Sequence, residues 1–198
     1  MRPTTLATTL LAAALLSGCV APIGPVQVTR FHAPEAAGEL GHGTIAIEAA
    51  PGMDAKSLEI EAYERAVARE LVKVGYAEVA PGQGSQVALV RMRRTSFKPG
   101  HEGGPVSVGV GGETGSYGSG VGVGVGLNLS GSPSEQVTTD LGVMIRDRAN
   151  GKTIWEGRAR FTVSAKAPLA QTTLGAPKMA EALFQDFPGN SGETLEVK

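Results

Sequence analysis

The sequence has few cysteines, few aromatic residues and no excess of either charge. The single cysteine among 198 residues excludes a disulfide framework and a cysteine-rich metal site. The formal net charge of −1 lacks the surplus of lysine and arginine that nucleic-acid binding requires, so we expect no nucleic-acid partner. No apolar run reaches the roughly 18 residues of a membrane-spanning helix. Hydrophobic residues nevertheless make up 41% of the chain, enough for the core of one domain.

The N-terminus has the pattern of a secreted precursor. Arg2 precedes an apolar run over residues 6–16, which has the length of a secretory h-region. The motif Leu16-Ser17-Gly18-Cys19 follows, and it resembles the lipobox of bacterial lipoproteins. The resemblance implies that residues 1–18 are a signal peptide cleaved between Gly18 and Cys19, and that the Cys19 thiol carries lipid. The alternative is a buried free cysteine after an ordinary signal peptide or a core helix.

Residues 19–25 are therefore expected to tether a domain to a membrane. Two or three acyl chains, palmitate among them, anchor stably because each buried methylene adds ~0.8 kcal/mol. Val20 stands where an aspartate would favour retention in the inner membrane, so the resemblance implies the outer membrane and its periplasmic face. From Cys19 to Val26 the chain is seven residues long. It can reach at most ~25 Å when fully extended.

Hydrophobic periodicity predicts a single domain over residues 26–189. Alternating patterns indicate strands at residues 26–31, 43–48, 76–79 and 86–97. Apolar residues at spacings of three and four predict helices over residues 57–74 and 176–187. Ser57 is the expected N-terminal cap of the first helix and Gly75 its left-handed stop. The polar residues 190–198 are expected to form a flexible tail.

A β-hairpin is predicted over residues 137–164. Its register follows from whether the apolar residues of each arm have odd or even numbers. Apolar residues occupy odd positions in both arms, and both arms must turn them to the same face of the sheet. A two-residue Asn-Gly loop would set core residues of one arm against solvent residues of the other. A three-residue loop over residues 149–151 pairs Ile145 with Trp155 instead. We therefore predict this loop, with Gly151 in a left-handed bulge.

A glycine-rich insert occupies residues 103–131 and contains twelve glycines. Valine or leucine alternates with glycine, serine or asparagine in two arms, which predicts a second hairpin turning within residues 112–120. Three interpretations stay open for this insert. It extends the main sheet or is a partly ordered loop, it is a self-association edge, or it contacts the membrane or an envelope protein partner.

Residue types suited to catalysis or metal binding are scattered. The three histidines are His32, His42 and His101. His101-Glu102 is followed by two glycines and a proline, so it cannot form a helical zinc motif. No catalytic residue, metal ligand or cofactor is therefore assigned, and serine acyl chemistry has no supporting motif. The carboxylates Asp140, Asp147 and Glu156 lie on the hairpin's outer face or near its turn, and we interpret them as pairing and solubility groups.

One basic group stands out near the end of the fourth predicted strand. It consists of Arg91, Arg93, Arg94 and Lys98. Such a group can be a solvated strand face, because lysine and arginine commonly protect strand edges. It can also contact anionic lipid head groups at ~1 kcal/mol for each residue. Both interpretations stay open.

Three further stretches are a helix that ends in Gly75-Tyr76, an arm with Trp155-Glu156-Gly157, and the closing segment at residues 183–188. Together they resemble a family of bacterial envelope lipoproteins, domain of unknown function 4136, over most of residues 26–189. The resemblance implies an α+β fold in which two helices pack on one face of an antiparallel β-sheet, here with a Gly-rich β-hairpin insert. It brings no known activity and no catalytic residues.

These observations predict a lipid-anchored protein of the cell envelope that binds a partner or supports the envelope without catalysis. The membrane is its expected partner through the N-terminal lipid. An alternative hypothesis is an oligomeric assembly or pore component built through the glycine-rich hairpin. A hydrolase is the third hypothesis.

Overall fold

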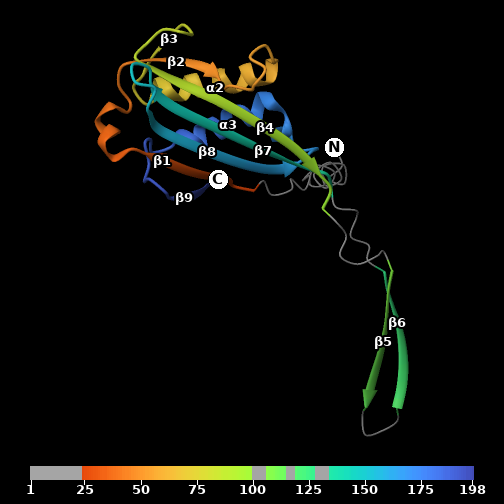
Figure 1. Ribbon diagram of the computed structural model, residues 1–198. Helices are drawn as coiled ribbons and strands as arrows, with labels where there is room; N and C mark the ends of the chain where they lie inside the picture. Colours follow the sequence, from red (N-terminus) through yellow and green to blue (C-terminus); the bar gives the residue numbers. More distant parts are fainter. Residues whose placement is uncertain (1–23, 100–105, 115–118, 128–133) are drawn as a thin grey trace, which may run out of the picture.

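The computed structural model describes residues 24–99, 106–114, 119–127 and 134–198. Figure 1 shows the arrangement of its helices and strands. In chain order the elements are β1 (Val26–His32), the 3-10 helix η2 (Pro34–Glu39), β2 (Thr44–Ala49), α2 (Leu58–Lys73), β3 (Ala77–Val79), β4 (Gln86–Phe97), β5 (Val106–Thr114), β6 (Ser119–Leu127), β7 (Gln136–Asp147), β8 (Thr153–Ser164), the 3-10 helix η3 (Pro168–Ala170), α3 (Thr172–Phe184) and β9 (Thr194–Val197). In the described part of the chain, no helix has both the length and the hydropathy needed to cross a bilayer.

Seven strands form one mixed sheet in the order β3-β2-β4-β7-β8-β1-β9. The pairs from β4 to β9 are antiparallel, whereas β2 runs parallel to both β3 and β4. The prediction of a purely antiparallel sheet was therefore wrong. β2 and β3 are joined through α2, and a crossover through a helix returns the chain in its original direction, whereas a hairpin reverses it.

Both α-helices lie on one face of the sheet, behind the strands in the view of Figure 1. α2 keeps the predicted apolar stripe, and Ile60, Tyr63, Val67 and Leu71 are all buried. Ser57 occupies its N-cap position, but its side chain makes no capping hydrogen bond. Gly75 follows the helix with a positive φ of 111°, as the left-handed stop requires.

α3 begins and ends earlier than the sequence predicted. It starts at Thr172 rather than residue 176, because Gly175 and Ala176 are buried and belong to its first two turns. It ends at Phe184, since Gln185 has an extended ψ of 131°. Phe187 therefore lies beyond the helix, although it still packs against the core.

The β7–β8 hairpin confirms the predicted register. Ile145 pairs with Trp155, and Gly151 has a positive φ of 70°. The loop is one residue longer than predicted, because the Asp147 N–H donates to the Lys152 carbonyl at 2.9 Å and leaves residues 148–151 between them. A register shift follows between Ile145 and Arg146, which restores the parity of the arms.

The prediction of a flexible tail was wrong for residues 194–197. They form β9, an edge strand paired antiparallel with β1. Leu195 and Val197 are half-buried opposite the buried Val28 and Val26. An alternating strand of four residues suffices here because β1 already offers its backbone groups for pairing.

β5 and β6 pair with each other in a two-stranded antiparallel sheet that is separate from the main one. Val106, Val108 and Val110 are opposite Leu127, Val125 and Val123. The interpretation of the insert as an extension of the main sheet was therefore wrong. Residues 115–118, which would form the turn, lie outside the described residues, so the hairpin insert stays a prediction.

Arg30 fastens β1 to the end of α3. Its side chain is only 3% exposed. Its Nε donates to the Leu183 carbonyl at 2.9 Å and its Nη2 to the Ala182 carbonyl at 3.0 Å. These carbonyls belong to the last turn of the helix, where the dipole is negative and partners are missing. Burial lowers the pKa of Arg30, while Asp186 and Glu193 counter that shift.

We expect Arg30→Met to lower the free energy of unfolding by about 1.5–3 kcal/mol, because two buried carbonyls lose charged donors. Urea denaturation followed by circular dichroism measures the change. Arg158→Met is the matched control, since Arg158 is exposed on the neighbouring strand β8 and its loss is expected to cost about 0.5 kcal/mol or less. Equal stability of the two variants would contradict the role of Arg30.

Candidate functional site

The predicted lipidation site lies outside the described residues. Gly18 and Cys19 fall in residues 1–23, and the first described strand begins at Val26 with a fully buried side chain. Val26 is seven residues after Cys19 in the sequence. The position of β1 in the sheet decides from which end of the domain this segment leaves.

The start of β1 lies at the same end of the sheet as both attachment points of the glycine-rich insert. Gln27 pairs with Arg160 near the end of β8, and Ser164 at the end of β8 pairs with Gln136 at the start of β7. Gln136 in turn pairs with Phe97, the last residue of β4. We call this end of the domain, which is on the right in Figure 1, the tether end.

Arg94 joins the two helices to the sheet at the tether end. Its guanidinium donates to Glu59 and Thr172, at 3.2 Å in each case, and to the Ala170 carbonyl. The Thr172 hydroxyl also donates to Glu59 at 3.0 Å. Because Glu59 is in the first turn of α2 and Thr172 begins α3, both helices start at this end.

We call the contacts among Arg94, Glu59, Thr172 and Ala170 the Arg94 junction. Because Arg94 belongs to it, the predicted basic group falls into two parts. Arg94 lies on the helix face and is held by its partners, whereas Arg91 and Arg93 are exposed on the opposite face of β4. Lys98 follows the strand and is exposed as well. The four residues therefore form no single binding cluster.

Tyr63 packs beneath the junction. It is buried, and burial raises the pKa of its hydroxyl, with Glu59 adding to the shift. Arg94 and a hydrogen bond with Thr139 oppose the shift. The hydroxyl stays protonated in the neutral range, which suits a structural hydrogen bond better than proton transfer.

Large apolar side chains are exposed around the tether end, and the sequence analysis did not single them out. Leu58 opens α2, Leu174 lies in the first turn of α3, and Phe97 ends β4. A signal existed for Leu58, because it lies off the stripe that begins at Ile60. Periodicity finds buried faces and gives no reason to examine an apolar residue outside them.

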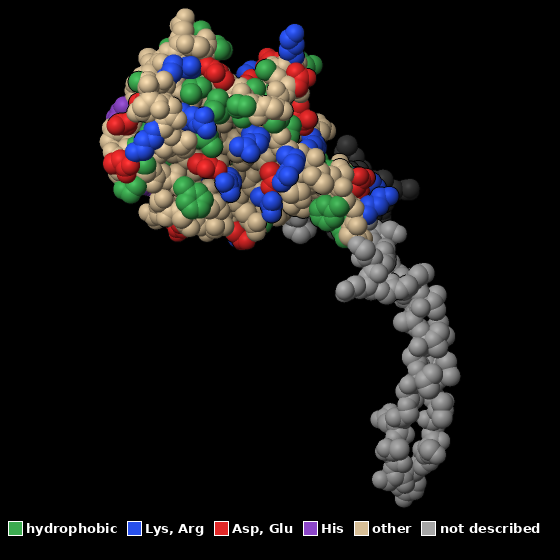
Figure 2. Space-filling view, in the orientation of Figure 1, with side chains coloured by type: hydrophobic (Ala, Val, Ile, Leu, Met, Phe, Trp, Pro, Cys, Tyr) green, Lys and Arg blue, Asp and Glu red, His purple; other side chains and the backbone are tan. Residues whose placement is uncertain are grey.

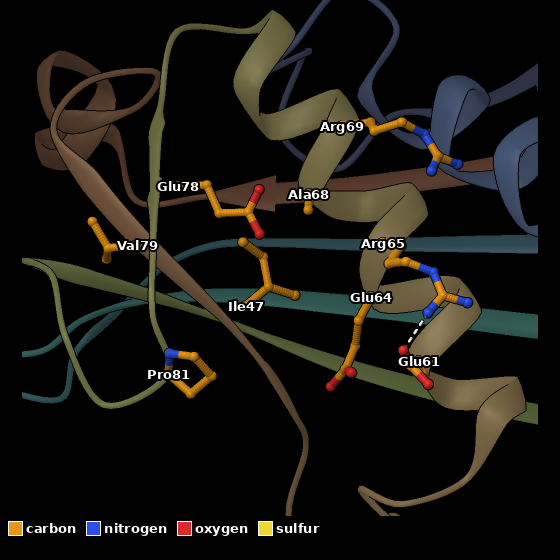
Figure 3. Close-up of a pocket in the computed structure, with 9 residues that line it drawn as sticks. All are labelled: Ile47, Glu61, Glu64, Arg65, Ala68, Arg69, Glu78, Val79 and Pro81. Carbon is orange, nitrogen blue, oxygen red and sulfur yellow. Dashed lines mark hydrogen bonds and ion pairs between the residues drawn. The ribbon is translucent and has the colours of Figure 1, made fainter.

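A groove of about 390 Å³ lies between α2 and the β2–β3 edge of the sheet (Figure 3). Its apolar lining comes from Ile47, Ala68, Val79 and Pro81, and its charged lining from Glu61, Glu64, Arg65, Arg69 and Glu78. Glu61 and Arg65 form an ion pair within α2. Burial raises the pKa of Glu64, and Glu61 adds to the shift. The groove offers charges of both signs to a polar ligand or side chain.

The sheet face opposite the helices is open and mainly basic (Figure 2). Its arginines are partly neutralised by carboxylates, as the sequence analysis expected. Asp140 accepts from Arg160 at 2.7 Å and lies 3.5 Å from Arg93, while Glu156 is 2.7 Å from Arg158. These pairs are exposed, so each contributes little to stability.

The histidines do not converge. His42 is exposed, His32 has a buried Nδ1 without a hydrogen-bond partner, and His101 lies outside the described residues. Asp147 accepts the Ala149 and Asn150 N–H groups inside the hairpin turn. Within residues 24–99 and 134–198, no three histidines, cysteines or carboxylates are grouped closely enough to hold a metal ion.

The three motifs that carry the family resemblance meet in one aromatic cluster. The Trp155 ring stacks on Phe184 with centroids 5.3 Å apart and lies 5.3 Å from Phe187. Tyr76 meets Phe187 edge to face at 6.3 Å. The Trp155 Nε1 donates to the Pro188 carbonyl at 3.0 Å. These contacts hold α3 and the following loop against the sheet, so the motifs are structural.

Comparison with known proteins identifies a family without an assigned activity. Residues 43–189 match the family described as a domain of unknown function (DUF4136). An uncharacterized protein of Zymomonas mobilis is 42% identical over 67 residues, which are 33% of this chain. Those residues cover 24% of that relative, so the chain spans about a quarter of the curated protein it matches.

Solved structures resemble the chain only distantly. A PDZ domain protein from Parabacteroides distasonis is 14% identical, with a TM-score of 0.48 over 99% of this chain and 43% of the other. A PelC dodecamer from Paraburkholderia phytofirmans is 12% identical, with a TM-score of 0.45 over 84% of this chain and 99% of the other.

Gly157 tests the structural role of the motifs, because a Cβ there would overlap the Trp155 ring and approach Leu183 Cδ1 at 2.8 Å. We expect Gly157→Ala to destabilise the domain by about 1–3 kcal/mol through overpacking. Gly142→Ala is the matched control on β7, where a Cβ meets nothing within 4 Å. Thermal unfolding should separate the two variants by at least about 2 °C, given about 2–4 °C per kcal/mol for this size. Equal melting temperatures would contradict the packing argument.

Proposed function

The chain belongs to the DUF4136 family, and from that premise we propose that it is a lipid-anchored protein of the cell envelope. It is held at the periplasmic face of the outer membrane by acyl chains on Cys19. There it binds a partner or supports the envelope without catalysing a reaction.

One observation carries the anchoring proposal. The lipobox-like motif Leu16-Ser17-Gly18-Cys19 is followed by a buried strand that begins at Val26. Seven residues separate Cys19 from Val26, so the domain lies within ~25 Å of its lipid.

The polar groups of the described surface support a binding role. In the groove beside α2, at the tether end and on the open sheet face, arginine and glutamate or aspartate occur mostly as ion pairs. The excess of arginine that these pairs leave on the open sheet face can give complementarity to an acidic partner surface.

Replacing Cys19 with serine tests the anchor. In cells fed labelled palmitate, the natural chain is expected to take up label and to fractionate with the outer membrane. Cys19→Ser should take up none and should accumulate as the uncleaved precursor, because an oxygen cannot replace the thioether sulfur. Ser17→Ala is the control, since it leaves a small residue before the cysteine and should keep both properties. Label on Cys19→Ser, or a mature chain with a free thiol, would overturn the anchor.

A second candidate function is self-assembly through the glycine-rich insert. In the described part of the chain, β5 and β6 pair only with each other, so each presents one edge that another strand can join. Glycines occupy opposing positions, such as Gly109 and Gly124, where a bare backbone permits close approach.

Deleting residues 105–129 separates the two candidate functions. If the insert builds an assembly, the detergent-extracted protein should form a discrete large species that collapses to monomers after the deletion. Light scattering coupled to size exclusion measures the mass. A monomer before the deletion would exclude the assembly while leaving the anchored binding module intact.

A further inference from the structure

Three of the five large apolar residues that are exposed in the described part of the chain lie at the end where the helices begin, whereas Phe31 and Val72 lie toward the other end. Leu58 is 79% exposed and Leu174 48% exposed, although both belong to helices whose other leucines, such as Leu71 and Leu183, are buried. Phe97 is 45% exposed at the end of β4. Isolated exposed apolar residues are common, but a group at one end of a domain marks a contact surface.

The Arg94 junction shows that these residues belong together. Leu58 is next to Glu59, and Leu174 lies two residues after Thr172, whose hydroxyl donates to that same carboxylate. Arg94 binds both side chains, and Phe97 follows it by three residues in the same strand. Leu58 and Leu174 therefore flank one compact polar junction on the helix face, and Phe97 lies at the same end of the domain on the opposite face of the sheet.

Lysines accompany the apolar residues. Lys56 precedes Leu58 by two residues, Lys98 follows Phe97, and Lys166 follows the end of β8; all three are exposed. Asp54 and Glu135 are exposed acidic residues at the same end. The basic excess is small, so apolar contact must supply most of any binding, with attraction to anionic head groups as a supplement.

We infer that the tether end rests on the surface of the lipid bilayer, with Leu58, Leu174 and Phe97 entering the head-group region. The inference rests on the proposed lipid anchor and adds which surface of the domain meets the membrane. The chain itself indicates that a lipid bilayer meets this surface. The segment that leads to Cys19 departs from this same end and reaches at most ~25 Å, so acyl chains inserted in a bilayer bring this end to the lipid.

Val72 provides a matched control position. It is 49% exposed, nearly the same as Leu174, and it lies in the last turn of α2 at the opposite end of the helix from Leu58. Because the Cys19 thiol is consumed by lipid in the anchored protein, Leu58→Cys, Leu174→Cys and Val72→Cys each introduce a single free thiol. All three positions are exposed, so the substitutions should leave the melting temperature unchanged.

The experiment labels each thiol of the full mature protein with an environment-sensitive dye. The protein is then reconstituted into vesicles of phosphatidylethanolamine and phosphatidylglycerol, with and without doxyl-labelled lipid. We expect a blue-shifted emission and quenching by the doxyl lipid at positions 58 and 174, and neither at position 72. Vesicles of phosphatidylcholine should retain the quenching, because the apolar contacts dominate.

Each other outcome has a distinct meaning. Protein that floats with the vesicles but shows no quenching at 58 and 174, or equal quenching at 72, overturns the inference and leaves the anchor intact. A blue shift at 58 and 174 without vesicles shows that protein, such as a second copy, covers the end, and this also overturns it. A chain that neither floats nor has a blocked Cys19 shows instead that the proposed anchor has failed.

Discussion

The fit of the Trp155 ring over Gly157 is the contact on which the rest of the fold depends. No side chain larger than hydrogen fits beneath that ring, and the ring in turn supports Phe184 and Phe187. Arg30 adds hydrogen bonds to the last carbonyls of α3. We call these residues, Trp155, Gly157, Phe184, Phe187 and Arg30, the aromatic joint. Through these contacts β1, β8, α3 and the loop after it become one unit. The position of β1, and with it the direction in which the N-terminal segment leaves, is set by this unit.

The same joint explains what family membership can and cannot convey. The motifs that resemble the DUF4136 family are the residues of the joint, so they carry the fold. A match built on Trp155 and Phe184 says little about ligands, because both side chains are buried against each other. Evidence on function has to come from surfaces, where the groove, the open sheet face and the tether end differ in chemistry.

Sequence reasoning succeeded where a single physical rule was sufficient. Parity alone decided that Ile145 faces Trp155, and helical spacing found the buried stripe of α2.

Sequence reasoning failed where two rules competed or where the pairing strand was distant in the sequence. The hairpin loop has one residue more than predicted, and a register shift beside Ile145 restores the predicted pairing of the arms. β2 became parallel to β3 because the chain crosses back through α2, and no local pattern predicts that β4 then pairs with the other edge of β2. β9 formed only because β1, far away in the sequence, had an edge to fill. Sequence reasoning missed the proposed membrane-contact residues Leu58, Leu174 and Phe97, because an amphipathic pattern identifies only the residues that an element buries.

The mixed topology gives these separate surfaces a common orientation. The helix crossover between β2 and β3 starts α2 at the end where β2, β4 and β8 finish, which is also where β1 and β7 begin. The start of β1, both attachments of the insert and the exposed Leu58 therefore share one end. The aromatic joint and the turn at Gly151 lie at the other, beside Ile145 and Trp155. A domain seated on lipid by its tether end would direct that second end toward the periplasm. Its open, arginine-bearing sheet face would then stand away from the bilayer, accessible to an acidic partner.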